Sequence, residues 1–311
     1  MRTAQGPPVY PISEGHRSPQ SIAAAALEAL RPHQWAKNAL VFVPLAAAHR
    51  LGDLNLLIAA ARAFAAFSLC ASSIYLLNDL RDAEADRLHP HKWHRPIASG
   101  RLPRSLALGL APLLLIAAIV TVVPLGLHAI EVLGLYFALT TAYTLGLKQV
   151  VLLDALVLAS GYALRVVIGG LAVHIRPSPQ LLAFCIFLFF SLALIKRYAE
   201  LCLLRQRDGP TAHARGYLFE DRELIMALGI SSGGLSVLVL ALYVSLGKAE
   251  HTYSRSEFIW FTCVLLLYWI SHMWLIAHRG RMTDDPLVFA FKNRVSLILA
   301  ILMGVTAWLA V

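Results

Sequence analysis

Residues 54–86 read LNLLIAAARAFAAFSLCASSIYLLNDLRDAEAD, a long apolar run that ends in a segment rich in acidic and amide side chains. The apolar part, residues 54–77, has the roughly 20 residues that a helix needs to cross a bilayer. In the segment that follows, Asn78, Asp82 and Asp86 are spaced four apart, so a helix would carry all three on one face. This combination predicts a membrane protein with a polar site at the bilayer surface.

The acidic segment has the side chains of a magnesium site. Hard oxygen ligands without a nearby cysteine favour Mg²⁺ over zinc, and Mg²⁺ binds through few carboxylates together with phosphate oxygens. We therefore expect Asn78, Asp82 and Asp86 to bind Mg²⁺ with a phosphate-bearing substrate. Asp79 would bind a second metal ion or orient the first one through water. The alternative is a solvated helix end with charges of both signs.

The composition predicts an all-α, polytopic membrane protein. Of the 311 residues, 58% are hydrophobic and 14% are charged, which exceeds what a soluble domain needs. No strand alternation is visible, so the spans should be helices. Nine apolar segments are candidates: 33–50, 54–77, 105–124, 128–147, 150–173, 180–200, 224–246, 256–276 and 287–310.

The distribution of basic residues predicts the orientation. With a cytoplasmic N-terminus, 21 of the 27 Lys and Arg residues lie on the cytoplasmic side and four on the other. The acidic segment then lies at the cytoplasmic surface of a bacterial plasma membrane. The net charge of +9 is a one-sided basic surface, which favours anionic lipid or phosphate as partner over nucleic acid.

The remaining organisation is simple. We expect residues 1–20 to form a disordered cytoplasmic tail and residues 21–311 to form a single membrane domain. The tail lacks the early apolar core of a signal peptide. The four cysteines lie in or beside apolar segments without metal-like spacing, which favours reduced, packing roles.

Basic residues that follow the acidic segment are candidates for phosphate binding. Lys92 and Arg95 could hold the far end of a metal-bound phosphate, and Pro96 fixes the chain before it as extended. His89, His91 and His94 suggest a metal site, but hydroxyl or phosphate contacts explain them as well.

The N-terminal motif RPHQWAKN, residues 31–38, supplies two further candidates. Arg31, Gln34 and Asn38 can share a helical face, and Trp35 could be an interface anchor. Lys37 is either a lysine that snorkels to the headgroups or, beside a carboxylate site, a phosphate ligand.

Three later segments carry charged residues within or at the ends of spans. Asp154 and Arg165 are three helical turns apart, with Arg165 near mid-membrane, where an arginine faces a cavity or a partner. Lys196 and Glu200 form either an ordinary helix pair or a second anion site. Asp285, before Pro286, is typical of a helix N-cap.

The acidic motif Asn78-Asp79-x-x-Asp82-x-x-x-Asp86 resembles the first acidic motif of the UbiA superfamily of intramembrane prenyltransferases. The resemblance covers nearly the whole chain. It implies nine transmembrane helices around a central cavity open to the cytoplasm and to lipid, and Mg²⁺–diphosphate bound at two acidic motifs. At the end of the sixth span, where the family has a second aspartate pair, this chain has Lys196-Arg197-Tyr198-Ala199-Glu200.

The combination of four motifs resembles one branch of that superfamily, the decaprenyl-phosphate phosphoribosyltransferases. These motifs are residues 31–38, 75–79 (YLLND), 95–98 (RPIA) and 196–200. The resemblance implies transfer of 5-phosphoribose from phosphoribosyl pyrophosphate to a polyprenyl phosphate, with release of pyrophosphate. For some bacteria the resemblance also implies a role in cell-wall arabinan synthesis.

These arguments define the expected site. The residues expected to be catalytic are Asp79, Asp82, Asp86 and Arg95, with Asn78, Asp82 and Asp86 as metal ligands. The residues expected to bind substrate are Lys37, Asn38, Lys92, Lys148, Asp154, Arg165, Lys196, Arg197 and Glu200.

Two other functions remain open. An aromatic-acceptor prenyltransferase would bind an allylic diphosphate at the same motif, but paired aspartates rather than Lys196 and Arg197 would favour it. A transporter of cations or anionic lipids should show two related halves, and no such repeat is visible.

Overall fold

The computed structural model describes residues 19–89, 92–208, 216–245, 253, 255, 257–282 and 285–310. Over these ranges the chain is helical and contains no β-strand. Residues 1–18 of the expected disordered tail, and His91, lie outside the described residues. The chain divides into two compact units: unit 1 is Met1–Ala39 with Ile58–Phe137, and unit 2 is Leu40–Leu57 with Ala138–Val311.

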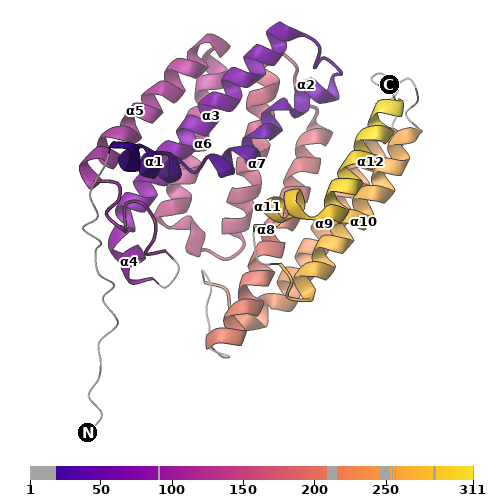
Figure 1. Ribbon diagram of the computed structural model, residues 1–311. Helices are drawn as coiled ribbons and strands as arrows, with labels where there is room; N and C mark the ends of the chain where they lie inside the picture. The colour runs from indigo at the N-terminus through magenta and orange to yellow at the C-terminus, as the bar shows by residue number, and fades with distance from the viewer. Residues whose placement is uncertain are drawn as a thin grey trace. The chain divides into compact units, whose positions relative to one another are not determined.

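Unit 1 is built on three long helices, α3, α5 and α6 (Figure 1). Along α3, Ala60, Ala63 and Ala66 are fully buried, and such small side chains let neighbouring helices approach closely. The Ser73 hydroxyl donates to the Ala111 carbonyl oxygen of α5 at 2.7 Å. The elements of this unit, three of which (η1, α3 and α6) have residues in unit 2, are α1 (Pro19–Leu30), η1 (Pro32–Phe42), α3 (Leu54–Arg81), α4 (Ala83–Leu88), α5 (Arg104–Val122), η2 (Val123–Leu125) and α6 (Leu127–Leu145).

Unit 2 is a bundle in which α8 packs against α7, α9 and α10. Its core surrounds α8, where Leu194, Ile195 and Leu201 are buried together with Met273 and Trp274 of α10. The elements are α2 (Val43–Ala47), η3 (Leu147–Gln149), α7 (Leu153–Ala172), α8 (Pro179–Asp208), η4 (Phe219–Asp221), α9 (Arg222–Ser245), α10 (Phe258–His278), α11 (Pro286–Lys292) and α12 (Arg294–Ala310).

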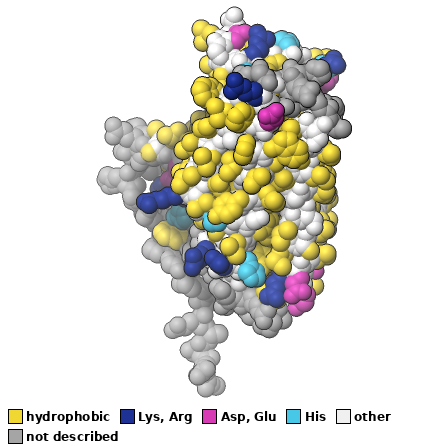
Figure 2. All heavy atoms as spheres, turned by 90° about the vertical axis from the view of Figure 1, so that its right-hand side faces the viewer, with side chains coloured by type: hydrophobic (Ala, Val, Ile, Leu, Met, Phe, Trp, Pro, Cys, Tyr) yellow, Lys and Arg dark blue, Asp and Glu magenta, His cyan; other side chains and the backbone are white. Residues whose placement is uncertain are grey.

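Several helices are long and apolar enough to cross a membrane. Six of the described helices qualify, or seven if the pair α11 and α12, bent by 82°, counts as one span. In Figure 2, hydrophobic side chains cover the middle of one face and charged side chains lie toward its two ends. The chain is therefore a multi-pass membrane protein.

The nine expected spans are not confirmed, and the differences have local causes. The segment 33–50 is not one long helix, since it contains the 3₁₀ helix η1 and the five-residue α2, which has Pro44 in its first turn. Helix α6 is 19 residues long but carries His128 and Glu131 near its start and is not among the six. The last segment is the bent pair.

Gly169 on α7 allows η1 to pack closely in unit 2. A Cβ atom at this position would lie 2.0 Å from the Val41 carbonyl oxygen. We expect Gly169→Ala to lower the free energy of unfolding by about 1–3 kcal/mol, the usual cost of overpacking. Unfolding in detergent, followed by circular dichroism, measures this. Gly134→Ala is the control, because a Cβ there meets nothing within 4 Å. Equal stability of the two variants would contradict the close packing.

Candidate functional site

The acidic motif continues the helical path of α3 into α4. The Asp82 amide donates to the Asn78 carbonyl oxygen at 2.9 Å, and the Asp86 amide donates to the Asp82 carbonyl oxygen at 2.8 Å. These i to i+4 bonds keep the spacing of a helix although α3 ends at Arg81 and Asp82 is the N-cap of α4. The backbone therefore places the three expected metal ligands along one side of the path.

Two arginines converge on the acid that follows Asn78. Arg31 Nη2 donates to both carboxylate oxygens of Asp79, at 2.8 and 2.9 Å. Arg95 Nη1 bridges Asp79 Oδ1 at 3.2 Å and Asp86 Oδ2 at 2.6 Å. Asp79 and Asp86 are seven residues apart, two helical turns, which brings both within reach of one guanidinium. Asp79 thus holds two cations in place.

Burial in this cluster is uneven. The carboxylates of Asp79 and Asp86 are 3% and 5% exposed, whereas Arg31 and Arg95 are 24% and 23% exposed. The Arg31 guanidinium also lies 5.1 Å from the centre of the Tyr75 ring. The acids are therefore the inner layer, and the arginines form the part that a ligand can reach.

A cavity of about 190 Å³ opens on these arginines. Because arginine presents a planar fork of donors, two such side chains on one wall suit a phosphate or pyrophosphate group. The lining residues are Glu28, Ala29, Arg31, His33, Asp79, His94, Arg95 and Pro96.

Hydrogen bonds fix the chain that carries Arg31. The Trp35 indole donates to the Ser72 hydroxyl at 3.0 Å, and that hydroxyl donates to the Leu30 carbonyl oxygen at 2.9 Å. Asn38, expected to bind substrate, is 1% exposed and donates to the Ser68 hydroxyl at 2.9 Å. In this structure the N-terminal motif is therefore attached to α3, and Asn38 acts in that attachment.

The acidic motif can supply only some of the ligands that a magnesium ion needs. Over the described ranges, no group of three or more His, Cys, Asp or Glu side chains is close enough to hold a metal ion. Asn78 and Asp82 are half-buried and, within the same ranges, have no side-chain ion pair, whereas Asp86 is engaged by Arg95. One or two protein oxygens completed by substrate phosphate is the usual way in which Mg²⁺ binds.

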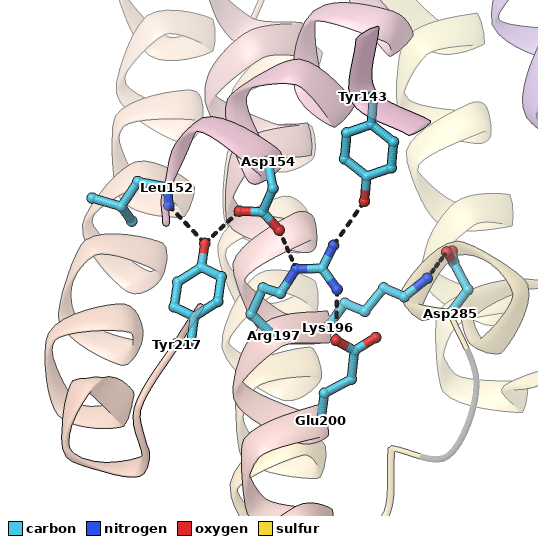
Figure 3. A network of polar contacts seen from close by, with 8 residues as sticks. All are labelled: Tyr143, Leu152, Asp154, Lys196, Arg197, Glu200, Tyr217 and Asp285. Carbon is cyan, nitrogen blue, oxygen red and sulfur yellow. Dashed lines mark hydrogen bonds and ion pairs between the residues drawn. The ribbon is translucent and has the colours of Figure 1, made fainter. Parts of the chain in front are cut away.

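The second cluster lies in unit 2, around the buried Arg197 (Figure 3). Its Nε donates to Asp154 Oδ2 at 2.5 Å, its Nη1 to Glu200 Oε2 at 2.6 Å and its Nη2 to the Tyr143 hydroxyl at 3.1 Å. Arg197 is 1% exposed and Asp154 is 0% exposed. Both were expected to bind substrate, but here they form an internal ion pair that joins α7 to α8.

Tyr217 completes this network. Its hydroxyl donates to Asp154 Oδ1 at 2.5 Å and accepts the Leu152 amide at 2.8 Å. Burial, followed by the hydrogen bond to Asp154, raises the pKa of Tyr217 well above its usual value, so the hydroxyl keeps its proton at neutral pH. Gly216 makes the position possible: its φ is +83°, and a Cβ would lie 2.4 Å from the Gln149 carbonyl oxygen.

Lys196, next to the buried arginine, has a different environment. Its ammonium group lies 3.1 Å from Asp285 Oδ2, with side-chain exposures of 32% and 19%. Asp285 caps α11 as expected, accepting the Leu287 amide. The sequence predicted the cap but not the ion pair. Lys196 is the more accessible cation of the two neighbours and keeps its role as a candidate anion ligand.

Four further residues were expected to bind substrate. Arg165 is 8% exposed, donates to the Gly161 carbonyl oxygen at 2.6 Å and lies 5.4 Å from the Tyr162 ring centre. Lys37, Lys92 and Lys148 are half-buried. Their roles in substrate binding stay predictions.

Sequence reasoning missed parts of both clusters. Arg31 was placed on a helical face with Gln34 and Asn38, whereas it contacts Asp79, 48 residues away. Tyr217 lies in an irregular segment with no periodicity. A signal was present for Arg31, because an arginine before a proline ends a helix and marks a bend.

Three relatives show what the chain is similar to. It is 34% identical over 288 residues to the decaprenyl-phosphate phosphoribosyltransferase of Mycolicibacterium smegmatis, with 90% of each chain covered. It is 35% identical over 271 residues to the nodulation protein NoeC of Azorhizobium caulinodans, covering 87% of this chain and 88% of NoeC. It is 34% identical to the uncharacterized protein y4nM of Sinorhizobium fredii, but spans only 54% of that protein's length.

A solved structure and a family model identify the fold and the family of this chain. A UbiA homolog from Archaeoglobus fulgidus, solved bound to DMAPP and Mg²⁺, superposes with a TM-score of 0.67 over 91% of this chain and 96% of that one, at 14% identity. At this identity the likeness concerns the fold alone. Residues 39–297 match the UbiA prenyltransferase family. The chain, a multi-pass membrane enzyme, therefore belongs to the UbiA prenyltransferase family.

Proposed function

We propose that this protein transfers 5-phosphoribose from phosphoribosyl pyrophosphate to a polyprenyl phosphate. A lipid phosphate oxygen forms a bond to the anomeric carbon, the bond from that carbon to pyrophosphate breaks, and pyrophosphate leaves with the bonding electrons. The lipid phosphate is already an anion at neutral pH, so the reaction needs no strong general base. The acceptor needs placement instead.

The observation that supports this most is the pair of arginines on Asp79. Arg31 and Arg95 line a cavity of about 190 Å³ beside the acidic motif, and their side chains are 24% and 23% exposed, whereas the carboxylates that they contact are 3% and 5% exposed. Pyrophosphate is a poor leaving group unless its charge is stabilised as it develops, and fixed guanidinium groups provide that stabilisation. The relatives named decaprenyl-phosphate phosphoribosyltransferase support the choice of substrates.

We assign the binding of the Mg²⁺ cofactor to the acidic motif. Asn78 and Asp82 would hold Mg²⁺, with Asp86 joining them if Arg95 releases it. When bound, the ion supplies positive charge to the pyrophosphate oxygens. Asp79 keeps Arg31 and Arg95 aimed at the cavity, which makes it a positioning residue.

In unit 2 we assign anion binding to Lys196. It is 32% exposed, and its partner Asp285 is a carboxylate that a phosphate can replace. Arg197, fully enclosed by Asp154, Glu200 and Tyr143, is assigned to holding α7 and α8 together.

The positive-inside pattern supports an acidic motif at the cytoplasmic face of a bacterial plasma membrane, where water-soluble phosphoribosyl pyrophosphate is available. For some bacteria, the resemblance of the sequence motifs to this branch implies a role in the synthesis of cell-wall arabinan.

Product analysis tests the proposal directly. Purified protein with Mg²⁺, phosphoribosyl pyrophosphate labelled in the ribose and decaprenyl phosphate should yield a labelled, lipid-soluble product and an equal amount of pyrophosphate. Mass spectrometry should show decaprenyl phosphate with one added phosphoribosyl group. Product formed only from a prenyl diphosphate and an aromatic acid would overturn the proposal in favour of aromatic prenylation. Flux across liposomes without any product would indicate a transporter.

Asp82→Asn tests the assignment of the acidic motif. We expect turnover to fall by about 100-fold or more, because the variant loses one of the ligands assigned to the Mg²⁺ ion that stabilises the charge on the leaving pyrophosphate. Stability should change little, since Asp82 makes no ion pair within the described ranges. Pyrophosphate release measures turnover across a magnesium titration.

The matched control is Glu84→Gln, which removes one negative charge from the same segment. Glu84 is 81% exposed and lies 3.3 Å from Arg104, so its loss should leave turnover within a factor of about two. Equal activity of Asp82→Asn and Glu84→Gln would refute the metal assignment.

A further inference from the structure

A second cleft in unit 2 lies away from the residues assigned to the reaction. It has a volume of about 980 Å³ at one end of α8, α9 and α10. Its lining residues are Tyr198, Cys202, Phe219, Arg222, Glu223, Met226, His278, Arg279 and Gly280.

Helix geometry separates this cleft from Lys196. Tyr198 and Cys202 are four residues apart and share one face of α8. Lys196 and Glu200 share another face of α8. Each precedes its counterpart in the cleft by two residues, so the two faces are about 200° apart around the helix axis at 3.6 residues per turn. The cleft is therefore on the opposite face of α8 from the candidate anion ligand.

The charges in the cleft favour an anion. Two arginines and one histidine face a single glutamate. Glu223 neutralises Arg222 weakly, because the two are 3.4 Å apart and are 78% and 37% exposed, respectively. The Arg222 guanidinium instead lies 4.6 Å from the Phe219 ring centre, which orients it while leaving its donors available.

Defined backbone carries the basic side chains of the cleft. The Tyr198 hydroxyl and His278 Nδ1 are 3.0 Å apart, which ties the imidazole to α8. Helix α10 ends at His278, and Gly280 follows its C-cap Arg279 with φ of +67° and an amide that donates to the Ala277 carbonyl oxygen at 3.0 Å. The Arg281 amide donates to the Ile276 carbonyl oxygen at 3.1 Å. This pair of bonds is a Schellman motif, which fixes the direction of the chain at Arg279.

The cleft lies at the ends of three apolar spans. The apolar span of α8 ends at Leu203, the span formed by η4 and α9 begins at Phe219, and the span of α10 ends at His278. Basic pockets between the ends of transmembrane helices suit phosphate headgroups. We propose that this cleft is a second phosphate-binding site, distinct from the reaction site, which holds the phosphate of an anionic lipid or of a soluble phosphate compound through Arg222, Arg279 and His278.

Cys202 provides a reporter inside the cleft. It is the one half-buried cysteine of the four, since Cys70, Cys185 and Cys263 are buried. N-ethylmaleimide should therefore modify Cys202 first, and mass spectrometry identifies the modified residue. Full-length protein in a neutral detergent is treated with the reagent alone, with inorganic phosphate, with dioctanoyl phosphatidylglycerol, or with zwitterionic dioctanoyl phosphatidylcholine.

We expect at least one of the two phosphate probes to slow modification of Cys202 at least threefold, and phosphatidylcholine to have no such effect. Protection by phosphatidylglycerol alone identifies a lipid headgroup site, and protection by inorganic phosphate identifies a site for soluble phosphates. The double variant Arg222→Gln, Arg279→Gln should raise the half-protecting concentration at least tenfold. The control Arg104→Gln, Arg294→Gln removes the same charge from exposed positions outside the cleft and should shift it less than twofold.

Three results would overturn the proposal: no protection by either phosphate probe, equal protection by phosphatidylcholine, or equal shifts in the two double variants. Arg222→Lys, which retains the charge, should keep most of the protection and so separates loss of binding from loss of folding. None of these residues belongs to the proposed reaction site, so failure here leaves the proposed function standing.

Discussion

Arg95→Gln should reduce the proposed phosphoribosyl transfer by about 100-fold or more, because Arg95 supplies charge at the cavity and holds two acids together. Its Nη1 bridges Asp79 and Asp86, whose carboxylates are 3% and 5% exposed. Removing one partner of such a buried pair costs roughly 3–5 kcal/mol, and the 23% exposure of Arg95 places the expected loss of stability at the lower end. Pyrophosphate release and thermal unfolding measure the two effects.

Two further variants separate the loss of activity from the loss of stability. Arg95→Gln combined with Asp86→Asn removes the uncompensated acid and should recover stability without recovering turnover. Arg104→Gln is the control, because Arg104 and Glu84 form an exposed pair at 48% and 81%. Turnover of Arg95→Gln within threefold of the unaltered protein would contradict the assignment.

Arg197→Met should have the largest effect on stability. The Asp154 carboxylate, which is 0% exposed, would lose its cationic partner. It would keep only its hydrogen bond from the neutral Tyr217 hydroxyl. Breaking a buried pair in this way costs roughly 3–5 kcal/mol. The fall in the midpoint of thermal unfolding, measured in detergent, gives the effect.

The neighbouring residue provides the contrast. Lys196→Met breaks a partly exposed pair and should cost about 1 kcal/mol or less, while lowering turnover through loss of anion binding. Arg197→Met combined with Asp154→Asn should regain part of the lost stability, because the acid is then neutral. If Arg197→Met unfolds at the same temperature as the unaltered protein, the structural role of Arg197 is wrong.

The sequence predicted the class of fold better than the number of spans. Apolar runs of about 20 residues correctly predicted an all-helical membrane protein. Hydropathy could not show that Pro32–Phe42 forms a 3₁₀ helix, or that α11 and α12 meet at 82°. Such features depend on local backbone geometry and on packing within each unit, neither of which leaves a periodic signal.

For the site, residue spacing predicted the side chains that lie along one helical path, but not the contacts made by residues from distant segments of the chain. The i to i+4 bonds at Asp82 and Asp86 keep the expected helical path. Arg31, whose own φ is +54°, contacts Asp79, and Tyr217 contacts Asp154 from an irregular segment. No pattern within a single segment could have predicted either contact.

Sequence adjacency was also a poor guide to burial. Lys196 and Arg197 are consecutive, and both were expected to bind an anion. One step along a helix is a rotation of about 100°, so one side chain faces the interior and the other its rim. Their exposures of 32% and 1% show the result.

Asp285 divides its two carboxylate oxygens between separate tasks. Oδ1 accepts the Leu287 amide at the start of α11, and Oδ2 receives the Lys196 ammonium. An arriving anion that takes Lys196 away therefore leaves the first turn of that short helix anchored. Under the proposed anion binding, exchange of partners at this lysine would be a local event, and the segment leading into the last helix would not need to unwind.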